Sequence, residues 1–270
     1  MEPSPRQNPI PKRDWRRAFG IIQTVIDDPT KTEEVIEIID ALGGPSFEKT
    51  FLRFAHTPEG QKLLAEKPDL LAALSDRERL SALPAGTFGR VYADFMTRGG
   101  ITAKGLAEAS DEARSRFPDA AAFDARDKDR EWFGQRLRDQ HDLWHVLTGY
   151  GMDEAGEAAN LSFSIGQFFN PGMLFLVCSS VLVVNPRMKL HWSRYMFQAW
   201  RRSKAVPKNF NLARFEELLE LPLEEVRQRL GVPPAEQFHP DGIGVLIRHT
   251  QGDDEIIWRF ADEPAVSVTI

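Results

Sequence analysis

The chain has 270 residues, of which 42% are hydrophobic, so it is long enough to bury a sizeable core in one large domain or two small ones. Its formal net charge of −6 argues against non-specific nucleic-acid binding, and we expect no nucleic-acid partner. The single cysteine, Cys178, excludes a disulfide framework and a cysteine-only zinc site, so nothing in the chain requires an oxidising compartment.

The N-terminal segment, MEPSPRQNPIPK, is rich in proline and lacks the apolar run of a signal peptide. We therefore expect residues 1–12 to form a disordered lead-in. Beyond it, apolar residues recur at spacings of three and four, with Gly or Pro between the segments, which predicts short helices around one core. One of these helices is expected to begin at a cap formed by Thr30 and to end at Gly43-Gly44. The fold class predicted for residues 13–235 is a single all-α domain.

The middle of the chain predicts a helix of about twenty residues ending near Tyr150 and a second helix from Asp153 to Phe169. The apolar run that follows, Pro171 to Val184, is shorter than the roughly 20 residues of a membrane-spanning helix. We interpret it as a buried core helix, with a segment that lines a lipid-accessible cavity or touches the bilayer interface as the alternative.

Positive charge is concentrated after this point, because residues 158–215 contain no Asp or Glu. The helix predicted from KLHWSRYMFQAWRRSK combines aromatic rings with cations, which suits a membrane surface carrying anionic lipid, or an anionic ligand. A solvated basic helix with its aromatic rings in the core fits the same pattern. The basic residues are Arg187, Lys189, Arg194, Arg201, Arg202, Lys204, Lys208 and Arg214.

The C-terminal segment GVLIRHTQGDDEIIWRF has two β-prone runs on either side of a polar turn, which predicts a hairpin. Residues 236–270 are therefore expected to form a short hairpin-like appendage to the helical domain.

Two of the six histidines lie one helical turn apart in HDLWH. At about 100° per residue, His141, Asp142 and His145 fall within one arc, so their side chains can converge beside the helix. Gly149 and Gly151 allow the chain to reverse, and Glu157 then lies about one turn into an antiparallel helix.

These four side chains offer two nitrogens and two oxygens to one cation, a set that suits a divalent metal such as zinc. Glu154, one turn before Glu157, is a candidate for a residue that contacts and orients the metal ligands without binding the metal itself. An ordinary salt-bridged surface explains the same spacing. We interpret the remaining histidines, His56, His191, His239 and His249, as structural.

The stretch HDLWHVLTGYGMDEAGE has the form HDxxH, eleven residues, then E. Together with LPAGTFGRVYADFM and FEELLELPLEEVRQRLGV, it resembles the coenzyme Q biosynthesis protein 4 family over roughly residues 20–235. The resemblance implies an all-α fold and a divalent metal, usually described as zinc, with His141, Asp142, His145 and Glu157 as ligands and as the catalytic site. The Pro-rich start and the hairpin-like tail depart from the family pattern.

The resemblance also implies coenzyme Q biosynthesis, either as a scaffold for the other enzymes or as the enzyme of oxidative decarboxylation at ring carbon C1. A polyprenylated ring substrate needs a cation at its head and an apolar sleeve for its tail, and the run Ser162 to Val184 could line that sleeve. Zinc has no redox chemistry, so dioxygen would react with the ring directly, or the metal would be iron, manganese or cobalt.

The partners implied are the polyprenylated ring, an anionic membrane surface, a quinone biosynthetic complex and a second copy of the chain. The location implied is cytoplasmic and peripheral, on the inner face of the membrane, or on the matrix side of the inner membrane if the protein is mitochondrial. Two other functions fit parts of the sequence. One is a non-catalytic, lipid-binding scaffold in which the metal only holds two helices together. The other is an HD-type phosphohydrolase, which would need an upstream histidine that only His56 could supply.

Overall fold

The structure is a computed structural model that describes residues 9–28, 31–116, 127–184, 186–248 and 256–261. The predicted cap Thr30, His249, and the outermost parts of the lead-in and tail lie outside the described residues. The elements are α1 (Trp15–Asp27), α2 (Thr32–Ala55), α3 (Pro58–Glu66), α4 (Leu70–Ser75), α5 (Arg77–Ala82), α6 (Phe88–Gly99), α7 (Ala103–Arg116), α8 (Lys128–Asp139), α9 (His141–Thr148), α10 (Glu154–Gln167), α11 (Pro171–Val183), α12 (Lys189–Lys204), η2 (Phe210–Leu212), α13 (Phe215–Leu218), α14 (Leu223–Leu230), η3 (Ala235–Gln237), β1 (Ile243–Arg248) and β2 (Ile256–Ala261).

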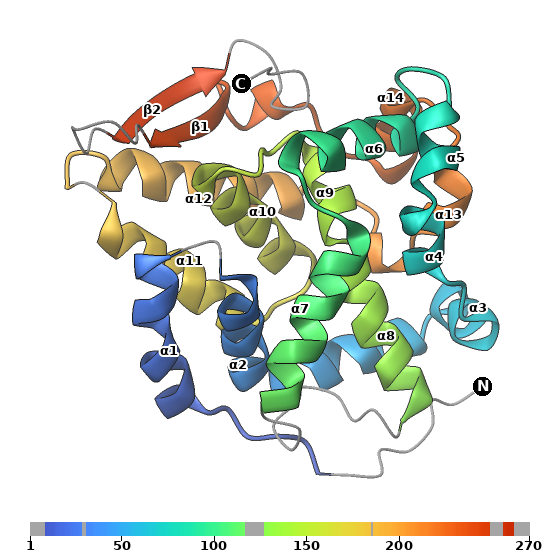
Figure 1. Cartoon of the computed structure of the whole chain (residues 1–270), viewed down its shortest axis with the longest axis horizontal. Coiled ribbons are helices and arrows are strands. Elements are labelled where there is room, and N and C mark those ends of the chain that lie inside the picture. Colours follow the sequence, from blue (N-terminus) through green and yellow to red (C-terminus); the bar gives the residue numbers. More distant parts are fainter. Residues whose placement is uncertain (1–8, 29–30, 117–126, 185, 249–255, 262–270) are drawn as a thin grey trace.

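Helices α9 and α10 lie in the middle of this helical array (Figure 1). Helix α10 packs against α11 and α12, and α9 packs against α6, α8 and α14. The largest hydrophobic cluster forms around them and includes Trp144, Phe163, Trp192 and Phe210. The described residues thus form one mostly helical domain, which confirms the predicted all-α fold class.

Helix α2 differs from its prediction, because it runs through Gly43-Gly44 and Pro45 instead of ending there. Pro45 has no N–H to donate to the carbonyl of Ala41, and the backbone N–H of Asp14 donates to that carbonyl instead, at 2.8 Å. The predicted end was wrong because a distant segment supplies the missing hydrogen bond. That segment also places Pro11 against Gly44, where a Cβ atom would lie 2.6 Å from the Pro11 carbonyl oxygen.

The predicted twenty-residue helix is divided into α8 and α9 at Gln140. The Gln140 side chain donates from Nε2 to Oδ1 of Asn211, a residue 71 positions later in the chain. Helix α9 ends at Thr148, and the next residue, Gly149, has a φ of 80°. Helix α10 begins at the predicted position, where the carboxylate of Asp153 accepts hydrogen bonds from the N–H groups of Ala155 and Gly156.

The apolar run forms α11, which begins after Asn170 and is buried along only part of its surface. Leu176 and Val177 are buried, whereas Leu174, Leu182 and Val183 are exposed. The interpretation of a buried core helix therefore fits one side of α11 and not the other, which faces solvent. None of the described helices combines the length and the apolar character needed to cross a bilayer.

At the C-terminal end, β1 and β2 pair as antiparallel strands over the segment for which the sequence predicts a hairpin (Figure 1). The residues that lead into β1 are not peripheral. His239 and Ile243 are both buried, and the Tyr150 hydroxyl lies 2.9 Å from Nε2 of His239. The first part of the predicted appendage thus packs on the loop that joins α9 to α10.

Candidate metal centre between two helices

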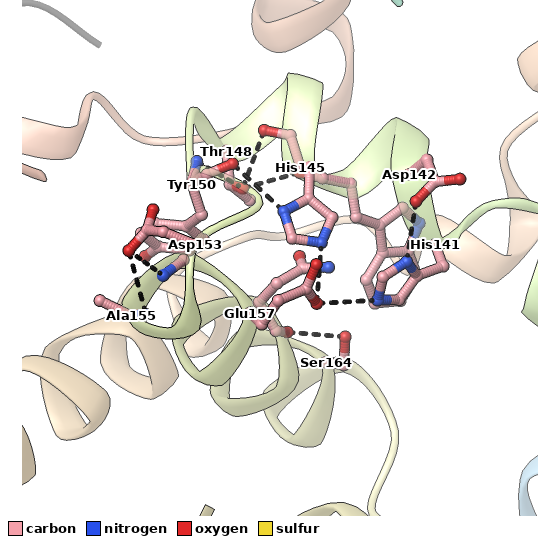
Figure 2. Close-up of polar contacts among 12 residues, drawn as sticks. His141, Asp142, His145, Thr148, Tyr150, Asp153, Ala155, Glu157 and Ser164 are labelled. Atoms are coloured by element: carbon pink, nitrogen blue, oxygen red, sulfur yellow. Dashed lines mark hydrogen bonds and ion pairs between the residues drawn. The ribbon is translucent and has the colours of Figure 1, made fainter. Parts of the chain in front are cut away.

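The histidines His141 and His145 lie one turn apart on α9, and their ring centroids are 4.9 Å apart. The reversal after α9 brings α10 alongside, because Gly156 passes close to the loop backbone. A Cβ atom on Gly156 would lie 2.0 Å from the carbonyl oxygen of Gly151. Glu157 then extends from α10 toward both imidazole rings (Figure 2).

The distances between the three side chains fit a shared cation. Oε2 of Glu157 lies 3.6 Å from Nε2 of His141 and 3.4 Å from Nε2 of His145. The three ligand atoms all lie within 4.8 Å of one another. Zinc–ligand bonds of about 2.0–2.2 Å in tetrahedral geometry separate two ligand atoms by roughly 3.3 Å. The three side chains therefore need little movement to bind one ion.

Both rings have their Nε2 atoms directed toward Glu157 by a contact at the opposite nitrogen. Nδ1 of His141 lies 3.1 Å from Oδ1 of Asp142, and Nδ1 of His145 lies 3.2 Å from the carbonyl oxygen of Tyr150 (Figure 2). A carbonyl or carboxylate oxygen only accepts, so each Nδ1 donates. In the neutral ring the lone pair is then on Nε2, the atom available to a metal.

Electrostatic interactions within the centre stabilise the charged forms of His141 and Glu157. Burial by itself lowers the pKa of His141, but the hydrogen bond to Asp142 and the charges of Glu157 and Asp142 outweigh it and raise this pKa to about 9. Burial alone would raise the pKa of Glu157, yet the neighbouring His145 and His141 lower it below its usual range. The metal-free centre is thus an imidazolium–carboxylate cluster at neutral pH, and a metal has to displace the proton of His141.

The centre is open on one side only. The side chain of His145 is 1% exposed, whereas those of His141 and Glu157 are 29% and 43% exposed. Nε2 of His145 is buried and has no hydrogen-bond partner among the described residues. A ligand can therefore reach the cluster past His141 and Glu157, and an ion would give the buried nitrogen its partner.

The structure brings together His141, His145 and Glu157, three of the four predicted ligands. It places the carboxylate of Asp142 behind the His141 ring, at Nδ1, and outside this group of three. Glu154 lies half-buried in the first turn of α10, and its role in orienting the metal ligands stays a prediction.

One polar partner could not be read from residue types, because the group that orients His145 is the main-chain carbonyl of Tyr150. His56, the histidine that a phosphohydrolase would need, is exposed at the end of α2 and bonded to the carbonyl of Leu52. It takes no part in the group of possible metal ligands.

A model of the family described as coenzyme Q (ubiquinone) biosynthesis protein Coq4 matches residues 17–236. The chain is 28% identical over 212 residues to the mitochondrial ubiquinone biosynthesis protein COQ4 of Phaeosphaeria nodorum, covering 77% of this chain and 68% of that protein. It is also 28% identical over 210 residues to the protein of the same name from Pyrenophora tritici-repentis, with the same coverage.

Among solved structures, a protein of Nostoc punctiforme described as a candidate for ubiquinone biosynthesis has a similar fold, with a TM-score of 0.57 at 21% identity. The alignment covers 81% of this chain and 97% of the Nostoc chain, and at this identity it bears on the fold alone. The match of the family model over most of the chain shows that the protein belongs to the coenzyme Q biosynthesis protein Coq4 family, and its function lies in coenzyme Q biosynthesis.

Proposed function

We propose that the protein is a metal-dependent enzyme that replaces the carboxylate at ring carbon C1 of a polyprenylated, hydroxybenzoate-derived intermediate by a hydroxyl group. The observation that supports this most is the buried Nε2 of His145, which has no hydrogen-bond partner among the described residues and lies 3.4 Å from the carboxylate of Glu157. A second imidazole, that of His141, faces the same carboxylate. This arrangement suits a cation held by three side chains, with room for an exchangeable ligand.

Two nitrogens and one carboxylate oxygen form a ligand set that zinc accepts readily and that iron, manganese or cobalt also accept. Catalytic zinc sites have three protein ligands and one open position, whereas structural sites are closed by four. The three residues that would hold the metal are His141, His145 and Glu157. When bound, the metal would supply Lewis acidity and a fixed point for the carboxylate or a neighbouring phenol oxygen of the substrate.

The protein groups around the centre orient these ligands and shape the approach of the substrate. Asp142 and the Tyr150 carbonyl fix the two imidazole rings, which reduces the reorganisation needed when the ion binds. The exposed edges of His141 and Glu157 give the head of the substrate its entrance. For the tail we propose the apolar stretch from Ser162 to Val184, in which Phe168 packs edge-on against Trp144 at 6.0 Å.

The proposed reaction breaks the bond between C1 and the carboxylate carbon, releases carbon dioxide and forms a carbon–oxygen bond at C1. The ring loses two electrons, which zinc cannot accept. The oxidant that we propose is dioxygen, which accepts the two electrons and is released as hydrogen peroxide, while water supplies the oxygen of the new hydroxyl group. Iron, manganese or cobalt held by the same residues would supply redox chemistry.

We infer that α12 carries the membrane contact. Its buried side includes Trp192, Tyr195 and Arg202, and the Arg202 guanidinium donates to the carbonyl of Thr148 at 2.7 Å. The opposite side is a stripe that alternates apolar and cationic side chains, an arrangement suited to the headgroup region of an anionic bilayer. The exposed apolar and cationic residues of this stripe are Leu190, Arg194, Phe197, Trp200, Arg201 and Lys204.

The fungal relatives are mitochondrial by name. For this chain we propose peripheral attachment to the inner face of the cytoplasmic membrane, or to the matrix side of the inner membrane if the protein is mitochondrial. A quinone biosynthetic complex and a second copy of the chain are the protein partners that we propose.

The experiment that tests the proposed reaction replaces Glu157 by Gln, which preserves the volume of the side chain and removes its charge. Cells that depend on Glu157→Gln should contain normal amounts of folded protein and should accumulate a prenylated ring that retains its C1 carboxylate. Mass spectrometry of lipid extracts detects this ring, and a thermal melt of the purified variant checks folding. Glu112→Gln, a surface change on α7, serves as the matched control.

A non-catalytic scaffold predicts a different result from the same cells. If the metal only joins α9 to α10, quinone synthesis should continue in a variant that remains folded and assembled. Normal quinone levels with a stable, metal-free Glu157→Gln protein would reject the catalytic proposal.

A further inference from the structure

Asn160 is a buried amide for which the fold provides no partner. Its side chain is completely buried in α10, and neither Oδ1 nor Nδ2 has a hydrogen-bond partner among the described residues. Its main-chain carbonyl accepts from the Ser164 hydroxyl at 2.8 Å, a contact that leaves the side-chain amide unpaired. Leaving both ends of a buried amide unpaired disfavours folding. A bound ligand that forms these hydrogen bonds would explain why an amide is present here.

The position of Asn160 connects it to the metal centre. It follows Glu157 by three residues, so the two side chains are neighbours on the surface of α10. Ser164 follows Asn160 by four residues, so Glu157, Asn160 and Ser164 share one side of α10. Figure 2 shows Glu157 and Ser164 below the two histidines. Glu157 is partly exposed while Asn160 is fully buried, so Asn160 lies on the inner side of the entrance to the centre.

A second buried group without a hydrogen bond is found at the same centre: Nε2 of His145 has no hydrogen-bond partner among the described residues, and its contact with Glu157 is an ion pair at 3.4 Å. An ion bound by His141, His145 and Glu157 would satisfy this nitrogen, but it could satisfy at most one end of the Asn160 amide. A ligand on the open position of the metal, with an oxygen that accepts and a hydroxyl that donates, would pair with both ends.

We propose that Asn160 is a substrate-binding residue, whose Nδ2 donates to an oxygen of the ligand on the metal and whose Oδ1 accepts from a ligand hydroxyl. The ligand class is a hydroxylated aromatic acid, and this choice rests on the function proposed above. An amide fits this task because it is uncharged, so it adds no repulsion toward an anionic head group beside Glu157.

The test uses the full-length protein, loaded with Co²⁺, and 4-hydroxybenzoate as the probe. Asn160→Leu removes both hydrogen-bonding groups at a similar volume. Its melting temperature should equal or exceed that of wild type, because an unpaired amide is lost. Its Co²⁺ affinity should stay within about twofold, and its affinity for 4-hydroxybenzoate, followed by the visible Co²⁺ spectrum and by calorimetry, should fall about tenfold or more.

Ser110→Ala is the matched control, because it removes a different buried polar group, a hydroxyl on α7 that also lacks a hydrogen-bond partner among the described residues. It should change neither affinity. Asn160→Asp provides the second variant should Asn160→Leu fail to fold, since it retains the shape and replaces the donor by a carboxylate that repels the probe.

Unchanged probe binding in Asn160→Leu, or in Asn160→Asp if only that variant folds, would overturn the assignment of Asn160 while leaving the proposed function intact. A large loss of Co²⁺ affinity in Asn160→Leu would also overturn it, because Asn160 would then be a metal ligand. If Co²⁺-loaded wild-type protein does not bind 4-hydroxybenzoate at all, both the proposed head group and this inference are rejected.

Discussion

The carboxylate of Asp142 lies 3.1 Å from Nδ1 of His141, on the side of the ring away from the nitrogen that faces Glu157. A carboxylate in this position orients the imidazole and increases its basicity toward a metal. Asp142→Asn should therefore lower the affinity of the protein for zinc by about 10- to 100-fold without preventing binding. Competition with a chromophoric chelator measures the affinity.

Asp129→Asn is the control for this change, because Asp129 contacts Lys67 on the surface, away from the centre. The visible spectrum of the Co²⁺-loaded proteins separates the two roles open to Asp142. A spectrum that changes its coordination signature in Asp142→Asn would make Asp142 a ligand and contradict the orienting role.

Sequence alone could bring the candidate ligands together, because helical periodicity places His141 and His145 on one side and the glycine-containing reversal returns Glu157 to them. It could not decide the role of Asp142, since an arc of about 100° allows the carboxylate to face the ion or the adjacent ring. That choice depends on the rotamer in the folded core. The contact of the Tyr150 carbonyl with His145 could not be predicted from residue types, because every residue has a main-chain carbonyl.

Helix boundaries could be predicted where the signals are local, as at the start of α10, and not where distant residues determine them. Helix α2 continues through Pro45 because the N–H of Asp14 reaches the carbonyl of Ala41, and the chain divides at Gln140 where its side chain bonds to Asn211. Single-sequence patterns carry no information on such contacts.

The buried pair of Tyr150 and His239 should make stability depend on pH. Burial and the charge of Arg202 lower the pKa of His239 to about 3, whereas an unfolded histidine titrates near 6.5. The unfolded chain binds the extra proton, so the contribution is fully present above about pH 6.5 and is lost progressively as the pH falls toward 3. The free energy of unfolding, from urea titrations at pH 7 and pH 5, should decrease less in His239→Gln than in wild type.

His191→Gln, which changes an exposed histidine of α12, should leave that pH dependence as it is in wild type. Equal decreases in wild type and His239→Gln would show that His239 is not the group responsible.

Because Pro11 packs against Gly44, no side chain should be tolerated at position 44. A Cβ atom there would lie 2.6 Å from the Pro11 carbonyl oxygen, so either the N-terminal segment or α2 must move. We expect Gly44→Ala to destabilise the protein by about 1–3 kcal/mol, measured by urea unfolding. Gly20→Ala on α1, whose Cβ would have no atom within 4 Å, should be neutral or stabilising. Equal effects of the two changes would refute the docking of this segment.

The exposed stripe of α12 should bind anionic membranes through both its charges and its rings. Leu190, Phe197 and Trp200 are exposed, the last two with stacked rings 5.5 Å apart, and cations separate them along the helix. Vesicles containing phosphatidylserine should therefore bind the protein more strongly than neutral vesicles in flotation assays, and added salt should weaken the binding. Reversing both Arg194 and Lys204 to Glu should remove most of this binding, because each cation near such a surface contributes about 1 kcal/mol.

The control reverses two exposed lysines elsewhere, Lys62 on α3 and Lys104 on α7, to Glu. This double variant has the same net charge as the α12 variant, and it should bind the vesicles nearly as well as wild type. Equal losses in the two double variants would mean that net charge alone, and not the face of α12, governs the attachment.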